Sequence, residues 1–476
     1  MSRFGLCLVL SLSFGCHQQS VLATFGPDAS SSKLDAGNLV PDIFMPMDAL
    51  HLDGSVLDMG TSSSDADIGV DAGTDYCEGA GPPIFVGDTT QICSNQLAVK
   101  TFRYALCLCE EHTAAAPVRV DAFNSEDGPY TSGQLGGSIG VNGRIQANAG
   151  YYASGSLWVA SPGGITSSLP MSVMADMHNQ GPMNGQSDLL VGNEAKIGGP
   201  VELNELVVTS TLTVPQNTNV NVSNLFSYGA YVRAPVSVAA PCDCEPEQLL
   251  NIAGYVRHHA TENDNEIAGI PHDLLDGFSD TTTVSIDCGR VYFSRVVGSG
   301  PLHITITGRT ALFIAGDLNL PGEFTITVEP GAELDLFIEG HLVSARRVQI
   351  GSQDAPSSVR MYLGGTGSFQ LSSDSVLWAN VYAPRAELVA SGPLEVFGSL
   401  FLRRLNTANT IDIHYDKGVL NKANACPPSA IPTECTSCRD CLNQACINGQ
   451  CSGCRTNRDC CSPLFCDDGS CKPFSL

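Results

Sequence analysis

The chain has 476 residues, which at roughly 150 residues per domain allows a few structural units. Hydrophobic residues make up 43% of the chain, which is enough for a sizeable core and argues against a wholly disordered protein. The 49 acidic and 24 basic residues give a net charge of -25, so phosphate backbones would repel the chain and we expect no nucleic-acid binding.

The first residues predict export. Arg3 is followed by an uncharged apolar run up to Gly15, which is too short to span a bilayer and is typical of a signal peptide, residues 1–15. The run ends in Leu12-Ser13-Phe14-Gly15-Cys16, which resembles the bacterial lipobox, in which the cysteine is acylated and becomes the N-terminus. Ser13 departs from that pattern, because Leu usually stands there. We predict lipidation of Cys16; ordinary cleavage after Ala23 is the alternative.

Residues 16–76 are predicted to be an acidic linker. Between His17 and Asp75 the chain has ten Asp and one Lys, with no sustained apolar period. Such a segment cannot bury enough apolar surface to offset its ordering entropy, so we expect an extended, disordered tether. The stretch from Asp65 to Asp71 loosely resembles a calcium loop, but it lacks the Gly and Glu that such a loop needs.

The body, residues 77–241 and 276–420, is predicted to be all-β. Short β-branched and aromatic runs alternate with turn residues. The segment that contains Gly316 is repeated around Gly340, 24 residues later, and a fixed period of this size favours a β-helix or solenoid over the alternative, a sandwich. In this register the matching apolar residues should point inward, namely Leu312, Ile314, Leu336 and Ile338.

One inserted helix is predicted within residues 242–275. Leu249, Ile252 and Val256 have helical spacing, and Pro246 suits a first helical turn. His258, His259 and Asp264 follow and could suggest a metal site. Adjacent histidines on a helix point in different directions and no HExxH pair is present, so a solvated helix end is the preferred interpretation.

The C-terminal residues 426–476 are predicted to be a small disulfide-rich module. Cys441-x4-Cys446-x4-Cys451 recurs 20 residues later, which indicates two knots. CxxC pairs could bind zinc, but a chain of 20 cysteines that is exported favours disulfides. The close neighbours Cys107/Cys109 and Cys242/Cys244 should each bond outward. The predicted disulfide cysteines are Cys77, Cys93, Cys107, Cys109, Cys242, Cys244, Cys288, Cys426, Cys435, Cys438, Cys441, Cys446, Cys451, Cys454, Cys460, Cys461, Cys466 and Cys471.

The number of cysteines in each part of the chain gives Cys426 a distinct role. Seven of these cysteines lie in the body and eleven lie at or beyond Cys426, so full oxidation needs a bridge between the two groups. Cys426 stands before the dense cluster, and we expect it to bond to a cysteine of the body.

Five segments of the body carry a resemblance: Phe102 to Cys109, Pro241 to Cys244, Cys288 to Tyr292, Gly308 to Phe313 and Val381 to Pro384. In these segments the body resembles a family of uncharacterised, secreted, myxobacterial-type surface lipoproteins. Its closing Ile413-His414-Tyr415-Asp416 is similar to the end of a β-helical module on some pilus-associated proteins, and the Cys-rich tail resembles modules that end many proteins of the same bacterial class. The resemblance implies a fold and a location but no catalytic residues.

Function is less constrained. No GxSxG, HExxH, P-loop or dinucleotide motif occurs, so we expect no catalytic activity, cofactor or metal. The sequence predicts a structural or adhesive lipoprotein on the outer membrane or cell surface. Its expected partners are the membrane, through the lipid anchor, and surface polysaccharide or other envelope proteins. A carbohydrate-active β-helix enzyme and a pilus-associated ligand-binding protein are the alternatives; carboxylates that converge beside an aromatic platform would favour the enzyme.

Overall fold

The computed structural model describes residues 84–86, 90–372, 375–425, 433–442 and 444–474. The predicted signal peptide, the lipidated Cys16 and the acidic linker lie outside these residues, as do Cys77 and Cys426. Among the described residues, no helix is long and apolar enough to cross a membrane.

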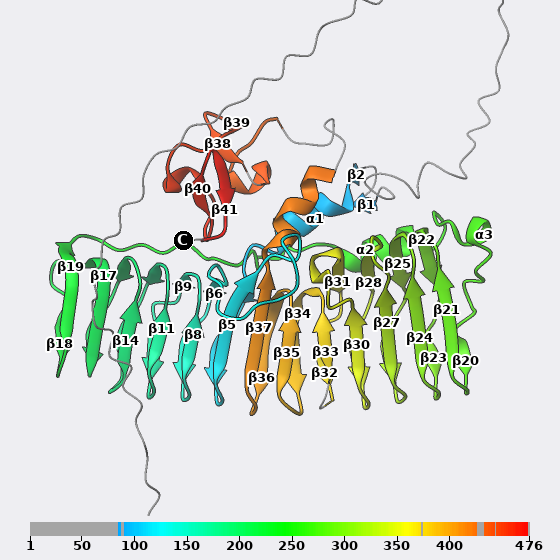
Figure 1. The fold of residues 1–476 in the computed structure, drawn as a ribbon, viewed down its shortest axis with the longest axis horizontal. Helices are drawn as coiled ribbons and strands as arrows, with labels where there is room; N and C mark the ends of the chain where they lie inside the picture. Colours follow the sequence, from blue (N-terminus) through cyan, green and yellow to red (C-terminus); the bar gives the residue numbers. More distant parts are fainter. Residues whose placement is uncertain (1–83, 87–89, 373–374, 426–432, 443, 475–476) are drawn as a thin grey trace, which may run out of the picture. The chain divides into compact units, whose positions relative to one another are not determined.

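The described chain is all-β, as the sequence predicts, and its body is a solenoid (Figure 1). Each coil contributes three short strands, and each strand pairs in parallel with its equivalent one coil later. In-register stacking repeats the same positions in every coil, so apolar residues form continuous columns inside the solenoid. Sandwich sheets are antiparallel, so that alternative is excluded.

The N-terminal half of the solenoid covers residues 106–233. Equivalent positions lie 20 and then 18 residues apart, as at Ile145, Ile165 and Met183. Its strands are β3 (Leu106–Leu108), β4 (His112–Ala114), β5 (Val118–Phe123), β6 (Ile139–Val141), β7 (Ile145–Ala147), β8 (Tyr151–Ala153), β9 (Leu157–Val159), β10 (Ile165–Ser167), β11 (Met171–Val173), β12 (Met177–Asn179), β13 (Met183–Asn184), β14 (Asp188–Val191), β15 (Ala195–Ile197), β16 (Val201–Leu203), β17 (Glu205–Val214), β18 (Val220–Val222) and β19 (Phe226–Arg233).

The C-terminal half covers residues 276–416. Its strands are β20 (Asp276–Phe278), β21 (Thr282–Ile286), β22 (Gly289–Phe293), β23 (Val297–Gly298), β24 (Leu302–Ile306), β25 (Arg309–Ile314), β26 (Leu318–Leu320), β27 (Phe324–Val328), β28 (Glu333–Ile338), β29 (Leu342–Ser344), β30 (Val348–Gly351), β31 (Val359–Leu363), β32 (Ser368–Leu371), β33 (Val376–Trp378), β34 (Asn380–Ala390), β35 (Leu394–Phe397), β36 (Leu400–Thr407) and β37 (Ile411–Asp416).

The predicted 24-residue register is confirmed in this half. Leu312 of β25 pairs with Leu336 of β28, and Ile314 pairs with Ile338. All four side chains are buried in the solenoid core. The repeated glycine-bounded segments are therefore successive coils of one wall.

The chain enters the solenoid in its middle (Figure 1). From β3 it winds outward to β19, returns along the solenoid as an irregular stretch, residues 234–251, and then winds inward from β20 to β37. We call residues 234–251 the crossing segment. The halves meet where β5 pairs with β37 and β3 pairs with β36, so one parallel sheet continues through the junction.

Disulfides fasten the crossing segment to the middle coil. Cys107 is bonded to Cys242 and Cys109 to Cys244, each pair 135 residues apart in sequence. Earlier in the segment, Val238 N donates to Gln180 Oε1 at 2.7 Å. Each cysteine of the two close pairs thus bonds outward, which leaves the crossing segment fixed against β3.

Residues 413–416, the closing motif of the resemblance, lie at the junction of the halves. His414 Nδ1 lies 2.7 Å from Asp121 Oδ1 on β5. The fully buried carboxylate of Asp416 accepts a hydrogen bond from Ser125 N at 3.0 Å. These side chains join the last coil of one half to the first coil of the other.

The helices differ from the single predicted one. Residues 242–275 contain two short helices, α2 (Ile252–His258) and α3 (Asn265–Ala268), and Pro246 precedes both. α2 begins at Ile252 because the side chain of Asn251 accepts from Gly254 N at 3.1 Å and caps the helix. Upstream, the disulfides of Cys242 and Cys244 hold the chain against β3, and the helix begins only after this stretch. Before the solenoid lie β1 (Ile84–Val86), β2 (Thr90–Ile92) and α1 (Ser94–Thr101).

The C-terminal module is built from two similar hairpins. They are β38 (Ala445–Ile447) with β39 (Gln450–Ser452), and β40 (Phe465–Asp467) with β41 (Ser470–Lys472). The two predicted knots are joined covalently by the Cys438–Cys461 bridge. The remaining four bridges are Cys435–Cys446, Cys441–Cys451, Cys454–Cys466 and Cys460–Cys471.

Candidate functional site

One outward-facing position repeats along a single wall of the solenoid. Its neighbours on each strand, such as Leu157 and Val159 beside Trp158, are buried in the core, so this position points away from the core. We call the series the outer column. In spatial order it consists of Tyr292, Phe313, Phe337, Tyr362, Tyr382, Phe401, Cys107, Gly140, Trp158, His178, Lys196 and Thr213.

In the C-terminal half the outer column is aromatic and covered. The ring centroids of Phe313 and Phe337 are 5.0 Å apart, and those of Phe337 and Tyr362 are 4.7 Å apart, both stacked. His259 at the end of α2 stacks on Phe313 at 4.0 Å. The expectation of a solvated helix end is wrong for His259, which is fully buried against this ladder, whereas Arg257 and Glu262 on either side of it are exposed.

The crossing segment covers the middle of the column. Cys107 is bonded to Cys242, and Gly140 supplies no side chain. A Cβ atom at Gly140 would lie 2.9 Å from Pro241 Cβ, so the segment lies directly on this coil. Trp158 comes next, and here the column borders an open pocket.

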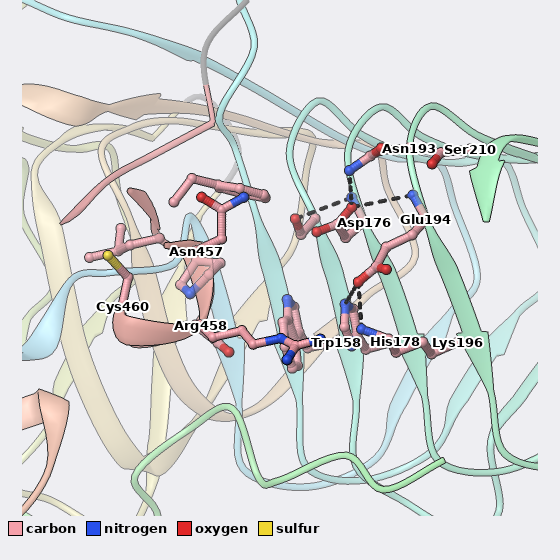
Figure 2. A pocket seen from close by; sticks show the side chains of 15 residues that line it. Trp158, Asp176, His178, Asn193, Glu194, Lys196, Ser210, Asn457, Arg458 and Cys460 are labelled. Atoms are coloured by element: carbon pink, nitrogen blue, oxygen red, sulfur yellow. Dashed lines mark hydrogen bonds and ion pairs between the residues drawn. The ribbon is translucent and has the colours of Figure 1, made fainter. Parts of the chain in front are cut away.

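The pocket has a volume of about 480 Å³, which is within the range for small-ligand sites. Figure 2 shows Trp158, His178 and Lys196 in a row on β9, β12 and β15, with Asp176 and Glu194 beside them. Residues of the C-terminal module, among them Arg458, line the pocket as well.

His178 extends the aromatic platform without adding charge. Its ring stacks on the Trp158 indole at 3.8 Å, with the planes within 6° of parallel. Burial, with the nearby charge of Lys196, lowers the pKa of His178 to about 3, so the ring is neutral at physiological pH. On the other side of Trp158 the outer column continues to Gly140, over which Pro241 of the crossing segment lies.

Two carboxylates stand beside this platform. Glu194 forms an ion pair with Lys196, and its Oε1 lies 3.6 Å from His178 Nε2. Asp176 Oδ1 accepts from Asn193 Nδ2 at 2.6 Å and from Glu194 N at 3.3 Å. Burial raises the pKa of Asp176. The arrangement brings acceptors, one ammonium donor and an aromatic surface into one pocket.

One polar atom of the pocket has no partner. Trp158 Nε1 is buried and has no hydrogen-bond partner among the described residues. A buried N–H that is left unpaired costs free energy.

Asp176, His178 and Glu194 also have the composition of a metal site. One ligand atom from each lies within 4.8 Å of the others. Glu194 is already bound to the Lys196 ammonium, however, and Asp176 Oδ1 already accepts two hydrogen bonds. A cation would have to displace Lys196, so this donor set does not suit a metal.

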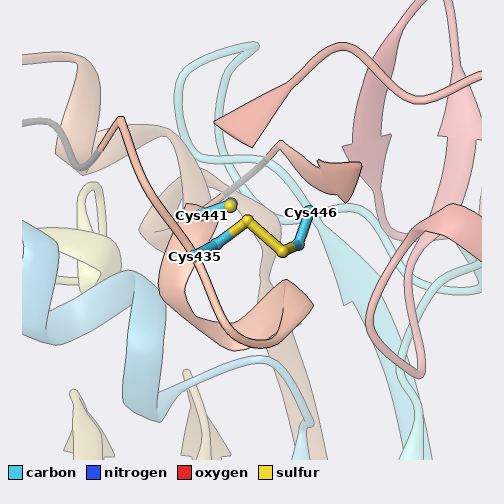
Figure 3. A group of neighbouring side chains, drawn as sticks. All are labelled: Cys435, Cys441 and Cys446. Carbon is cyan, nitrogen blue, oxygen red and sulfur yellow. A yellow bond between two sulfur atoms is a disulfide. The ribbon is translucent and has the colours of Figure 1, made fainter. Parts of the chain in front are cut away.

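The clusters of cysteines in the module are disulfides rather than metal ligands. Cys435, Cys441 and Cys446 gather closely, but Cys435 is bonded to Cys446 and Cys441 to Cys451 (Figure 3). No thiolate of this cluster is left for zinc.

The other cysteines and histidines singled out from the sequence have structural contacts. The ten cysteines from Cys435 onward pair among themselves, and Cys93 and Cys288 are disulfide-bonded too. Asp264 binds Arg290 through both carboxylate oxygens, at 2.9 Å each, and is committed to that pair.

The pocket residues were not predicted from the sequence. Trp158, His178 and Lys196 are spaced by 20 and 18 residues, the same intervals that separate equivalent strands. Aligning the coils of residues 106–233 at this uneven period would have placed the three side chains in one column.

Comparison with known proteins gives one match. Residues 243–421 match a family model described as a domain of unknown function, DUF7305. The matched residues run from the crossing segment to just beyond β37 and include every strand of the C-terminal half. No curated protein and no solved structure matches the chain. The chain is thus similar to an uncharacterised family over its C-terminal half, and the Trp158 pocket lies on the coils that precede the match.

Proposed function

We propose that this protein is a surface-anchored adhesive lipoprotein that binds a neutral saccharide in the Trp158 pocket. The observation that carries the proposal is the stack of Trp158 and His178. This part of the outer column lines a pocket whose other residues include hydrogen-bonding side chains. Aromatic faces pack against the C–H faces of sugar rings, while Glu194 and Lys196 can accept from and donate to hydroxyl groups.

Charge favours a neutral ligand. The chain has a net charge of -25, and in the pocket itself Lys196 and Arg458 only balance Asp176 and Glu194, so the pocket has no excess of positive charge. A polyanionic polysaccharide would be repelled at long range. Uncharged hexose polymers meet no such barrier.

The location rests on the N-terminal sequence and on cysteine chemistry. A signal peptide followed by Cys16 is typical of a lipoprotein, and bonded cysteines in the solenoid and the module suit an oxidising compartment. We predict that Cys16→Ala moves the protein from the membrane fraction to the soluble fraction of the cell envelope. Unchanged membrane association of this variant would contradict the anchor.

Fluorescence tests the ligand, because the chain has only two tryptophans. In a Trp378→Phe variant, Trp158 is the remaining indole, and titration with neutral gluco-, galacto- and manno-oligosaccharides should produce a saturable emission change for at least one of them. Trp158→Ala should weaken that affinity at least tenfold by calorimetry, or about 1.4 kcal/mol. Trp378→Ala is the matched control and should bind as the wild type does.

The opposite result is equally clear. Equal affinity of Trp158→Ala and wild type, or binding of anionic polysaccharides in preference to neutral ones, would contradict the proposal.

Hydrolysis of the saccharide is a second candidate, favoured by the convergence of Asp176 and Glu194. A glycosidase needs a protonated carboxyl beside an ionised one. Burial raises the pKa of Asp176, which is the direction such a pair requires, and Glu194 is ion-paired with Lys196. The hydrogen bonds that Asp176 already accepts favour a structural role. Release of reducing sugar during the titration, abolished by Asp176→Asn, would establish hydrolysis in place of simple binding.

A further inference from the structure

The two ends of the solenoid are finished differently. At the end formed by the C-terminal half, the edge strand β22 is covered. The side chain of Asn265 accepts from Tyr292 N at 2.7 Å and donates to Tyr292 O at 2.9 Å, and Arg290 N donates to Asp264 Oδ2 at 2.8 Å. These contacts satisfy the backbone of β22 and block further pairing of that strand, whereas β20 and β21 of the same coil pair only with β23 and β24.

At the end formed by the N-terminal half, neither strand of the last coil has a cover like that of β22 among the described residues. β18 pairs only with β16 and β19 only with β17, so each presents a backbone edge. We call residues 219–233, which hold both strands, the open coil. Its side chains are mostly exposed, in contrast to the buried strands of the coil beneath.

The open coil places aromatic rings where the core would continue. Phe226 and Tyr228 occupy the positions above the buried Leu206 and Val208, yet they are 39% and 42% exposed. Their ring centroids lie 4.9 Å apart, and Tyr231 lies 5.3 Å from Tyr228. An apolar patch beside unpaired strand edges is typical of an interaction surface.

The charge of this end indicates what covers it. Residues 215–233 contain no acidic residue and one basic residue, Arg233, although the whole chain carries a net charge of -25. Arg233 is itself engaged, because it donates to the backbone oxygens of Pro215 and Thr218. Two identical faces of this kind can approach without like-charge repulsion between them.

We propose that two copies of this chain associate head to head through the open coil. A two-fold axis would set β19 antiparallel to β19 of the second copy, which pairs both edges at once and stacks the aromatic rows against each other. The dimer would carry two Trp158 pockets and bind a polymeric ligand bivalently, so its apparent affinity would exceed that of one pocket.

Sedimentation and small-angle scattering of the full chain test this association. Cys16→Ser serves as the background, so that no lipid is attached. We expect a concentration-dependent dimer whose maximum dimension is close to twice that of the monomer. Tyr228→Asp and Tyr228→Lys should each weaken association at least tenfold, and an equimolar mixture of the two should recover dimer, which a merely misfolded variant would not do.

The matched control lies at the covered end. Ile267 is 58% exposed on α3, and Ile267→Asp should leave the dimer unchanged. A wild type that stays monomeric at all concentrations, or a dimer that Tyr228→Asp does not weaken, would overturn the proposal.

Discussion

Leu336 shows at the scale of one residue how the coils hold together. It lies on β28 between Leu312 of the preceding coil and Met361 of the next, and it is fully buried. Removing its side chain would leave a cavity, and the neighbouring side chains on the two adjacent coils are held in place and cannot fill it. We predict that Leu336→Ala lowers the free energy of unfolding by about 2–5 kcal/mol in urea denaturation.

An exposed residue of the adjacent wall provides the control. Thr327 on β27 points to solvent, so Thr327→Ala should change stability by no more than about 0.5 kcal/mol. Equal effects of the two substitutions would show that Leu336 does not carry packing energy between coils.

Residue-level prediction from sequence succeeded where a short repeat was present. The match around Gly316 and Gly340 assigns Leu312 and Leu336 to the interior, and both are there. Phe313 and Phe337 lie between inward residues and would be exposed by alternation alone. They are buried because α2, from outside the repeat, packs on them, and no local pattern encodes that contact.

At the scale of elements, the junction of β37 and β5 depends on a titratable contact. Burial alone would lower the pKa of His414, but the hydrogen bond to Asp121 and the charges of Asp121, Glu395 and Asp412 outweigh burial and raise it. The folded pKa is then above the unfolded value of about 6.5. The contact therefore stabilises the junction fully below pH 6.5, and this contribution is lost as the pH rises through the folded pKa.

We predict that the loss of stability caused by His414→Gln is larger at pH 6 than at pH 9. Urea unfolding monitored by circular dichroism at both pH values measures the difference. In an Asp121→Asn background, the pH dependence of the His414→Gln effect should shrink, because the partner that raises the pKa is gone. A loss that stays constant or grows with pH would contradict the assigned role of this pair.

Strands could be predicted better than helices. Alternating apolar residues and frequent turn residues identify short strands, and this prediction does not depend on the order in which the coils stack in space. The helical region depended on Asn251, whose capping side chain moves the start of α2 beyond Pro246, and on the bridge from Cys244 to Cys109. The pairing of distant cysteines is not encoded in their spacing, so the boundary could not be predicted.

At the scale of the whole solenoid, the path of the chain is the feature that sequence did not predict. A repeat in chain order suggests coils laid down from one end to the other. Here β5 and β37 are neighbouring strands, although their paired residues Asp121 and His414 are 293 positions apart in the sequence. These contacts need strands from both halves, and the crossing segment is tied to the same middle coil through the bridges to β3.

This path also organises the proposed adhesive surface. The crossing segment and the helices cover the outer column up to Gly140 and leave Trp158 at the edge of the cover. The platform therefore rests on coils whose own packing is continuous with the rest of the solenoid, which favours a pre-formed site.

Adhesion of whole cells tests the central claim most directly. Cells that display the full chain should attach to a surface coated with the neutral polysaccharide identified by titration. Cells that display Trp158→Ala at the same surface level should detach under shear at least tenfold more readily, whereas Trp378→Ala cells should adhere as the wild type does. Equal adhesion of Trp158→Ala and wild-type cells would contradict the account.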